Sequence, residues 1–302
     1  MTNSMSAERK AALVAMAGIG VALTVMALKY CAYLWTGSVA LYSDALESVV
    51  NVVTAVAALA AIKVSAQPAD KNHPFGHHKA EYLSAVLEGS LIIVAALLIF
   101  REVFEAVTTE HVFESSGAGL GFNGLATVLN GVWSYFLVSR GRALRSPALI
   151  ADGWHLFTDV LTSVGVLAGV VLSVLTGYAI LDPLLAMAVA VYILWSGYRI
   201  IATSMSGLMD EAVGSDIEMR IRDAIKTGGH GALQAHDIRT RHAGRATFIE
   251  FHLVVPGSMT VHEAHDICDR LEEALEAQIE GSDVVIHVEP EHKLKRLGAV
   301  EL

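Results

Sequence analysis

The sequence predicts a membrane bundle of six α-helices followed by a small cytoplasmic α+β domain of ferredoxin-like order. Apolar residues make up 54% of the 302 residues, charged residues only 17%, and the mean hydropathy is +0.51. A soluble domain of this length carries more charge and fewer long apolar runs. We therefore expect a transmembrane domain at 1–206, a cytoplasmic domain at 207–292 and a loose tail at 293–302.

Six apolar segments are each long enough to cross a bilayer, which takes roughly 20 helical residues. They lie near 11–35, 38–63, 81–107, 118–138, 148–175 and 180–205. Lys and Arg flank the first segment on its N-terminal side and recur in every second loop, whereas the alternate loops carry none. Because basic residues accumulate on the cytoplasmic side, both termini are predicted to be cytoplasmic, with the protein in the cell (inner) membrane.

After residue 206 the pattern becomes that of a soluble domain. Amphipathic helices and alternating strands are expected, in the order helix, strand, strand, helix, strand, at 215–227, 235–241, 247–255, 261–278 and 283–288. Such an order over about 80 residues favours helices packed on one face of a sheet.

Two apolar segments carry matching polar residues. The stretches 43–56 and 151–164 align without a gap, and each has polar positions that step by three and then four residues: Asp44, Glu47 and Asn51 in the first, Asp152, His155 and Asp159 in the second. On a helix this spacing places each set on one face. Ionisable residues at membrane depth are costly and usually mark an ion path.

Four of these residues make a candidate metal site with nitrogen and oxygen ligands and no sulfur: Glu47, Asn51, His155 and Asp159. Imidazole and carboxylate suit divalent first-row metals such as Zn, Fe, Co or Mn. The alternative is that the same residues only bond neighbouring helices. Asp44 and Asp152 are expected one turn towards the outer face, either as an exit or proton-relay layer or as packing residues.

Two further clusters have the composition of metal sites. The loop after the second segment spaces Asp70, His73 and His77 for one small ion, although a solvated loop is its plainer interpretation. The last third of the chain holds eight of the thirteen histidines. Candidate ligands there, which can converge in one sheet or across a dimer, are His236, His252, His265, His287 and Glu289.

Four motifs together resemble the cation diffusion facilitator family, in its iron/zinc efflux branch. They are Gln-Pro-Ala-Asp-x-Asn-His-x-Phe-Gly-His-x-Lys-Ala-Glu at 67–81, His-x-x-x-Asp at 155–159, Phe-Ile-x-x-His at 248–252 and Gly-Ser-Asp-Val-Val-Ile-His at 281–287. The resemblance implies a homodimer in the lipid bilayer, an intramembrane transport site and a binuclear cytoplasmic site on the ligand sets given above. It also implies a charge interlock near the dimer interface at Lys79 and Asp210.

The function implied by the resemblance is export of Zn or Fe, with Mn, Co and Cd also in range, in exchange for protons. The sequence departs from the branch at the second-segment ligands, which are commonly two Asp, or His and Asp, but here are Glu47 and Asn51. Asn51 cannot ionise, so the site carries one negative charge fewer than a site with Asp there. Glu289 likewise stands where the family often has Asp.

Other classes of function fit less well. The acidic last third does not favour nucleic-acid binding, and two cysteines form neither a disulfide framework nor a thiolate cluster. A metalloenzyme is disfavoured because His262-Glu263-Ala264-His265 has the wrong spacing for a zinc-protease helix. A channel is disfavoured because tight ligation slows release. A membrane metal sensor that binds without transport is the remaining alternative, although a sensor needs no ligands buried in the membrane.

Overall fold

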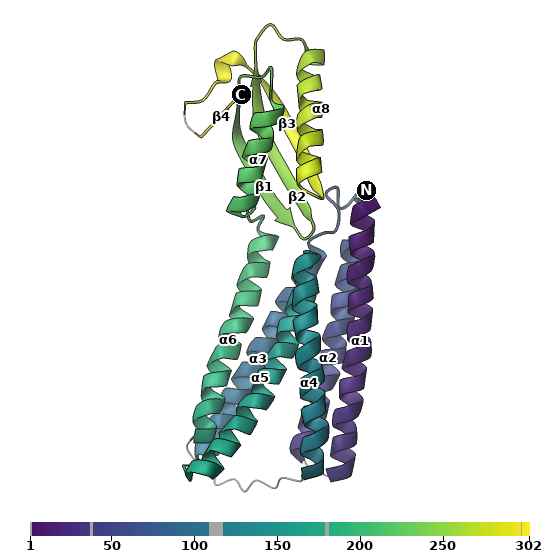
Figure 1. The fold of residues 1–302 in the computed structure, drawn as a ribbon, viewed down its shortest axis with the longest axis vertical. Helices are drawn as coiled ribbons and strands as arrows, with labels where there is room; N and C mark the ends of the chain where they lie inside the picture. The colour runs from purple at the N-terminus through teal and green to yellow at the C-terminus, as the bar shows by residue number, and fades with distance from the viewer. Residues whose placement is uncertain (1, 37–38, 109–116, 179–180, 297) are drawn as a thin grey trace. The chain divides into compact units, whose positions relative to one another are not determined.

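The computed structural model describes residues 2–36, 39–108, 117–178, 181–296 and 298–302. It divides into two compact units, Met1–Met205 and Ser206–Leu302 (Figure 1). The first unit contains the long helices and the second contains the sheet.

Long helices make up the first unit. They are α1 (Thr2–Thr36), α2 (Val39–Ser65), α3 (Ala80–Thr108), α4 (Gly117–Ala143), α5 (Pro147–Thr176) and α6 (Leu181–Leu208). Within the described residues, four stretches are long and apolar enough to cross a membrane: Arg9–Leu34, Ser48–Ser65, Ala80–Arg101 and Leu184–Leu208. The prediction of a helical membrane domain is confirmed for these four, and the crossing by α4 and α5 stays a prediction.

Small residues let the helices approach one another closely. A Cβ atom added to Gly153 on α5 would lie 2.7 Å from Val138 Cγ2 on α4, and one added to Gly89 on α3 would lie 3.1 Å from the backbone oxygen of Gly197 on α6. Glycine at such crossings is typical of helix packing in lipid. The α4–α5 crossing lies directly beside the predicted ligands on α5.

Helices α2 and α5 run in opposite directions (Figure 1). Ile62, near the end of α2, packs in one apolar cluster with Leu149, near the start of α5. Further back along α2, Asn51 bonds with Asp159, further on along α5. The two polar faces predicted from the sequence therefore meet in antiparallel fashion.

The second unit has the predicted helix and strand order and one additional strand. Its elements are α7 (Ser215–Gly228), β1 (Gln234–Ala243), β2 (Ala246–Val255), α8 (Val261–Gln278), β3 (Ser282–Pro290), the short 3-10 helix η1 (Glu291–Lys293) and β4 (Val300–Glu301). The sheet order is β3-β2-β1-β4, with β2 and β3 parallel and the other pairs antiparallel. A loose tail was expected at 293–302, but β4 pairs with Gln234 and Ala235 of β1.

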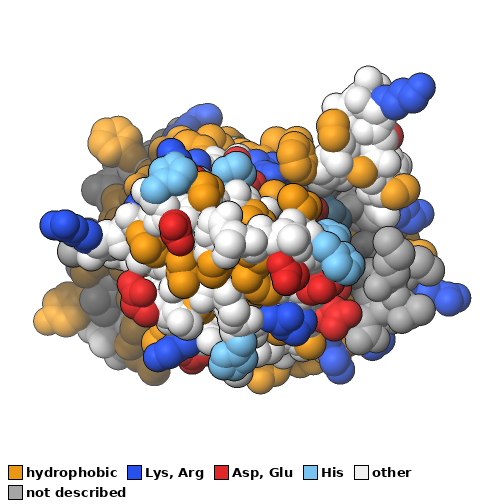
Figure 2. Space-filling view, turned by 90° about the horizontal axis from the view of Figure 1, so that it is seen from above, with side chains coloured by type: hydrophobic (Ala, Val, Ile, Leu, Met, Phe, Trp, Pro, Cys, Tyr) orange, Lys and Arg blue, Asp and Glu red, His pale blue; other side chains and the backbone are white. Residues whose placement is uncertain are grey.

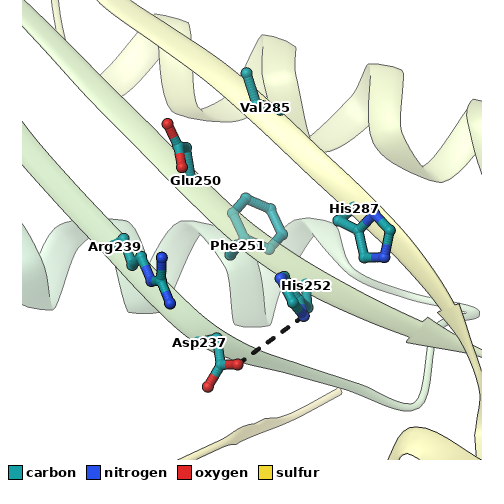
Figure 3. Close-up of a pocket in the computed structure, with 7 residues that line it drawn as sticks. All are labelled: Asp237, Arg239, Glu250, Phe251, His252, Val285 and His287. Atoms are coloured by element: carbon teal, nitrogen blue, oxygen red, sulfur yellow. Dashed lines mark ion pairs between the residues drawn. The ribbon is translucent and has the colours of Figure 1, made fainter.

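Alternation along the strands separates a core face from an open face. Ile249, Phe251 and Leu253 of β2 are at most 1% exposed and pack against α7 and α8. The residues between them, Glu250 and His252, point the other way, because successive side chains of a strand lie on opposite faces. Figure 3 shows both helices behind the sheet and His252 in front of it.

The net charge of −10 is not gathered into one surface patch on the face shown in Figure 2. Acidic, basic and histidine side chains are interspersed there with hydrophobic ones. The distribution of side-chain types on this face therefore does not single out the candidate metal-binding histidines.

Candidate metal centres

Three of the four predicted intramembrane ligands meet between α2 and α5. Asn51 Nδ2 donates to Asp159 Oδ2 at 2.7 Å, and Asn51 Oδ1 lies 3.0 Å from His155 Nε2. The three residues are 3%, 8% and 4% exposed, in the order Asn51, Asp159 and His155. Glu47 belongs to α2, but its side chain lies outside the described residues, as does that of Asp44.

The spacing within this cluster fits a small cation. With bonds of 2.0–2.1 Å, ligand atoms around a tetrahedral ion lie roughly 3.3 Å apart, and the 3.0 Å between His155 Nε2 and Asn51 Oδ1 is close to this value. Asp159 currently accepts a hydrogen bond from the other side of the same amide. Asn51 thus joins the imidazole and the carboxylate through the oxygen and the NH2 group of its side-chain amide.

Asp44 and Asp152 do not form one layer on the outer side of the cluster. Helices α2 and α5 are antiparallel. Asp44, which comes before Asn51 on α2, is therefore placed towards the end of the cluster where Asp159 lies, whereas Asp152, which comes before His155 on α5, is placed towards the other end. The expectation that both lie one turn towards the same face is therefore wrong: their positions are on opposite sides of the cluster, and Asp152 lies towards the start of α5, the end beside Arg145. Asp152 is 3% exposed and its Oδ2 lies 3.9 Å from where a Cβ of Gly18 would stand.

Glu88 on α3 is a buried carboxylate that the sequence reasoning missed. Its side chain is fully buried; Ser84 Oγ lies 3.4 Å from Oε1, and Oε2 has no hydrogen-bond partner among the described residues. Glu88 and Asp152 are near enough for their charges to interact. The available signal was a single acidic residue in an apolar run, which is weaker than a pair at helical spacing.

The loop cluster is preformed by local hydrogen bonds. Asp70 Oδ1 accepts from the backbone N–H groups of Asn72 at 2.8 Å and His73 at 2.7 Å, the pattern of an Asx turn. The hydrogen bond from His73 holds the pKa of Asp70 below its usual value, so the carboxylate is ionised near neutral pH. Asp70 Oδ1 lies 3.2 Å from His73 Nδ1 and Oδ2 lies 3.6 Å from His77 Nε2, so all three predicted residues converge.

Strand register aligns three of the predicted cytoplasmic ligands. His236 of β1 pairs directly with His252 of β2, which pairs directly with His287 of β3. The ring centroids of adjacent histidines are 5.4 Å and 4.9 Å apart. All three lie on the open face of the sheet, because side chains at paired positions share a face.

Glu289 closes this cluster. Its two oxygens lie 3.2 Å from His236 Nε2, 3.3 Å from His252 Nδ1 and 3.8 Å from His287 Nε2. Both ring nitrogens of His236 and Oε2 of Glu289 are buried, and they make no hydrogen bond within the described chain. Buried polar atoms normally have partners. Orphaned ligand atoms at roughly the 3.3 Å spacing of a tetrahedral ion are what a metal site requires.

His265 is not brought to this cluster within one chain. It lies on α8, which packs against the opposite face of the sheet, its side chain is 70% exposed, and Nε2 is 3.6 Å from Asp269 Oδ1. Its role as a ligand stays a prediction.

Asp237 is a cytoplasmic candidate ligand that the sequence reasoning missed: its Oδ2 lies 4.0 Å from His252 Nδ1, and ligand atoms of His236, Asp237 and His252 lie within 4.8 Å of one another.

The backbone explains why Asp237 turns towards the histidines. Asp237 has φ of 51° and lies in the register shift between His236 and Arg239. A bulge of this kind adds a residue to one strand and redirects its side chain.

Asp210, one of the two predicted interlock residues, bonds with Arg241 at 3.0 Å, and its pairing with Lys79 stays a prediction.

Comparison with known proteins places both units. A family model described as the cation efflux transmembrane domain matches residues 15–209, and one described as the cytoplasmic domain of cation efflux proteins matches residues 213–291. An uncharacterized transporter of Synechocystis sp. is 43% identical over 276 residues, 91% of this chain and 89% of that protein. The cation-efflux pump FieF of Serratia proteamaculans is 33% identical over 279 residues, 91% of each chain. A solved structure, the Zn form of CzrB, is 46% identical and covers 29% of this chain and 99% of that chain, with a TM-score of 0.28.

Proposed function

The chain belongs to the cation efflux family, the cation diffusion facilitators, and we propose that it exports divalent transition-metal cations from the cytoplasm in exchange for protons. Membership of this family, predicted from the sequence motifs, is confirmed, and with it the prediction of a multi-pass membrane transporter rather than an enzyme. The proposal adds the direction, the counter-ion, six membrane crossings, both termini in the cytoplasm and a location in the inner membrane.

The buried cluster between α2 and α5 is the observation that carries the proposal. An amide lies within hydrogen-bonding distance of an imidazole on one side and of a carboxylate on the other, at three residues that are each at most 8% exposed. Groups of this kind are costly inside a bilayer and are typical of ion pathways. With Glu47 as a fourth ligand from α2, the set is that of a tetrahedral site for a hard-to-borderline divalent cation.

Transport follows from competition between metal and protons at this cluster. A cation arriving from the cytoplasm binds neutral His155 and ionised Asp159, and it replaces the hydrogen bond between Asn51 and Asp159. Relative movement of the helices then opens the site outward. There, protonation of His155 removes a ligand, because imidazolium has no lone pair to offer, and the cation leaves. An inward proton gradient thereby drives the cation outward.

Zn and Fe are the first candidates for the cargo, and Mn, Co and Cd are the alternatives. Nitrogen and carboxylate ligands without sulfur accept all of these ions. Asn51 contributes an oxygen without a charge, so the site attracts a divalent cation less strongly than one with Asp at this position. Weaker binding favours release, which is a requirement for turnover.

The second unit is proposed to dimerise the protein and to bind metal as a regulator. Its His236, His252, His287 and Glu289 cluster on one face of the sheet, where His252 and His287 are exposed and His236 and Glu289 are buried behind them, so metal would enter through the two exposed histidines. His265, exposed on α8, is available to a second copy of the chain. Metal that accumulates in the cytoplasm would then tighten the dimer.

The test is metal uptake into proteoliposomes under an imposed pH gradient, with Zn, Fe, Mn, Co and Cd compared in turn. We expect gradient-dependent uptake of at least one ion by the native protein. Asp159→Ala should abolish it, whereas Asp223→Ala, which removes an exposed aspartate on α7, should leave it unchanged. Wild-type rates in both Asp159→Ala and His155→Ala would show that the site is assigned wrongly. Tight binding without transport of any ion would identify a sensor instead.

A further inference from the structure

A lysine from the C-terminal tail, Lys295, forms an ion pair with a carboxylate oxygen of the cytoplasmic cluster. Lys295 Nζ contacts Asp237 Oδ2, the same carboxylate oxygen that faces His252 Nδ1 at 4.0 Å. The two side chains form an ion pair, with Lys295 Nζ donating to the Asp237 carboxylate. A cation therefore already sits where a metal would compete for Asp237.

The tail reaches this position through a set of hydrogen bonds to one buried side chain. Gln234, 2% exposed, donates from Nε2 to the Lys295 carbonyl and to Glu301 Oε1, both at 2.9 Å, and its Oε1 accepts from Lys295 N–H at 2.8 Å. Both the NH2 group and the oxygen of the Gln234 side-chain amide therefore bond to the tail. The backbone of Lys295 is held at the edge of the sheet, and the ammonium is directed to Asp237.

The end of the tail is packed as well as bonded. Val300 and Glu301 pair with Ala235 and Gln234 as β4, and Leu302 packs on the hydrophobic core, where its side chain lies 2.7 Å from a Cβ placed at Gly229. The glycine leaves room for that leucine. The contact between Lys295 and Asp237 is therefore part of a defined arrangement and not a chance meeting of two exposed side chains.

We propose that Lys295 is a built-in competitor for metal at the cytoplasmic cluster, and that a divalent cation binding Asp237 with His252 displaces it and loosens the tail. The ligand class is a first-row divalent transition metal, because the ligand atoms are imidazole nitrogens and carboxylate oxygens. The 4.0 Å between Asp237 and His252 exceeds the roughly 3.3 Å of two ligands on one tetrahedral ion. Binding of both residues to one ion would therefore draw Asp237 Oδ2 towards His252, and the ion would compete with Lys295 for that oxygen.

Metal binding at Asp237 and release of the tail should be coupled, so either metal affinity or tail order can be used to follow the same equilibrium. While Lys295 holds Asp237, a metal has to replace an ion pair before it gains the carboxylate. An exposed ion pair contributes at most about 1 kcal/mol, which is about fivefold in a binding constant. Because Lys295 is held in place by the bonded tail, we expect its removal to raise metal affinity by about two- to fivefold, within that limit. By the same linkage, metal should destabilise the tail in the native protein. The inference rests on the cytoplasmic metal site proposed above and not on transport.

The experiment uses the full chain in detergent, in an Asp159→Ala, His73→Ala background that removes the intramembrane and loop sites from the measurement. Zn affinity is determined by competition with a chromophoric chelator, and hydrogen exchange is followed in peptides from 294–302. We expect Lys295→Gln to bind Zn about two- to fivefold more tightly than its parent. Lys293→Gln, a matched charge removal on η1, should bind as the parent does. Zn should speed exchange in the tail of the parent and not in a His252→Ala variant.

The two ways of failing are distinguishable. If His252→Ala and Glu289→Ala leave Zn affinity as in the parent, the cytoplasmic metal site itself is absent. If those variants weaken binding but Lys295→Gln does not strengthen it, and Zn leaves tail exchange unchanged, the site exists and the competition by Lys295 is overturned.

Discussion

The intramembrane cluster and the cytoplasmic cluster use similar ligands in opposite surroundings. Asn51, His155 and Asp159 are each at most 8% exposed and are held between two helices by hydrogen bonds to one another. On the open face of the sheet, the side chains of His252 and His287 are 37% and 67% exposed and are aligned by strand register. The described ligands of the first cluster are all buried, whereas the second cluster combines buried His236 and Glu289 with two histidines that solvent reaches.

This difference separates access from affinity. On the proposed assignment, metal would enter or leave the intramembrane cluster only when α2, α5 or their neighbours move, and helix movements of this kind take microseconds to seconds. At the sheet, metal would meet the exposed His252 and His287 first and would reach buried His236 and Glu289 by side-chain rearrangement, without movement of the strands. A buried site coupled to helix movement suits a cargo, and an exposed site on a rigid sheet suits a sensor of free concentration.

The largest expected effect is on the rate at which a chelator strips bound Zn. The native protein should release Zn in a fast phase and a slow phase, and we expect the slow phase to be at least about tenfold slower because it requires helix opening. His155→Ala should abolish the slow phase and keep the fast one. The measurement is stopped-flow absorbance with excess chelator.

His252→Ala is the matched histidine substitution on the sheet, and it should keep the slow phase with its rate unchanged. Equal stripping rates in the two variants would mean that both clusters are equally accessible, and the comparison between a closed and an open site would fail.

A smaller effect is expected from helix packing beside the intramembrane cluster. Gly153→Ala places a Cβ 2.7 Å from Val138 Cγ2 and 3.0 Å from the Val138 backbone nitrogen. Overpacking of this kind costs about 1–3 kcal/mol. Because Gly153 is two residues from His155, the shift of α5 should weaken metal binding and lower thermal stability together. Unfolding followed by circular dichroism and Zn binding at the cluster check the two effects.

Gly124→Ala is the control on α4, since a Cβ there meets nothing within 4 Å. It should leave the Zn affinity unchanged and should not lower thermal stability, because Ala is favoured over Gly inside a helix by about 1 kcal/mol. If Gly153→Ala destabilised the protein but left the affinity of the cluster intact, packing and ligation in the membrane unit would be independent, contrary to the geometry.

The sequence reasoning succeeded where the chemistry was carried by local spacing. The i, i+4 pairs predicted the meeting of Asn51 with His155 and Asp159, and the loop cluster follows from residues seven positions apart or fewer. It failed where direction or register decides: Asp44 and Asp152 were placed on the same side of the cluster because the antiparallel order of α2 and α5 was not applied. Glu88 lies alone within its apolar run, and the other buried carboxylate at helical spacing on α3, Glu81, stands in the charged motif that precedes the run.

Long-range contacts account for what was missed in the cytoplasmic unit. Strand patterns located His236, His252 and His287 on strands, but only the register shows that they stand side by side. Asp237 faces the cluster because its backbone has a positive φ within a bulge. Aspartate adopts this conformation more readily than most residues but does not require it, so the sequence does not reveal it. β4 has two residues and depends on Gln234, more than 60 positions away, so no periodic pattern marks it.

The smallest predicted effect tests whether fold and site are separable in the cytoplasmic unit. Thr260 caps α8: its Oγ1 accepts from Glu263 N–H at 3.3 Å, and Glu263 Oε2 accepts from Thr260 N–H at 2.8 Å. Loss of such a cap costs about 1 kcal/mol, so Thr260→Ala should lower the stability of this unit by about that amount in denaturant unfolding. Because α8 covers the face of the sheet opposite the cluster, Zn affinity should stay within about twofold of the native value.

The pH dependence of this capping effect has a definite sign. The hydrogen bond from the Thr260 backbone lowers the pKa of Glu263 from its ordinary value of 4.5. The stabilisation by the carboxylate is therefore complete above pH 4.5 and is lost as the pH falls through the lowered pKa of the folded state. Thr260→Ala keeps this backbone hydrogen bond and loses the one that Thr260 Oγ1 donates to Glu263 Oε2 at 2.8 Å. The part of the stability difference that comes from this hydroxyl–carboxylate bond should therefore shrink as the pH falls through the lowered pKa. A fall in Zn affinity that tracked the loss of stability at neutral pH would show that the sheet does not hold its ligands independently of α8. The contrast with the Gly153 substitution would then disappear.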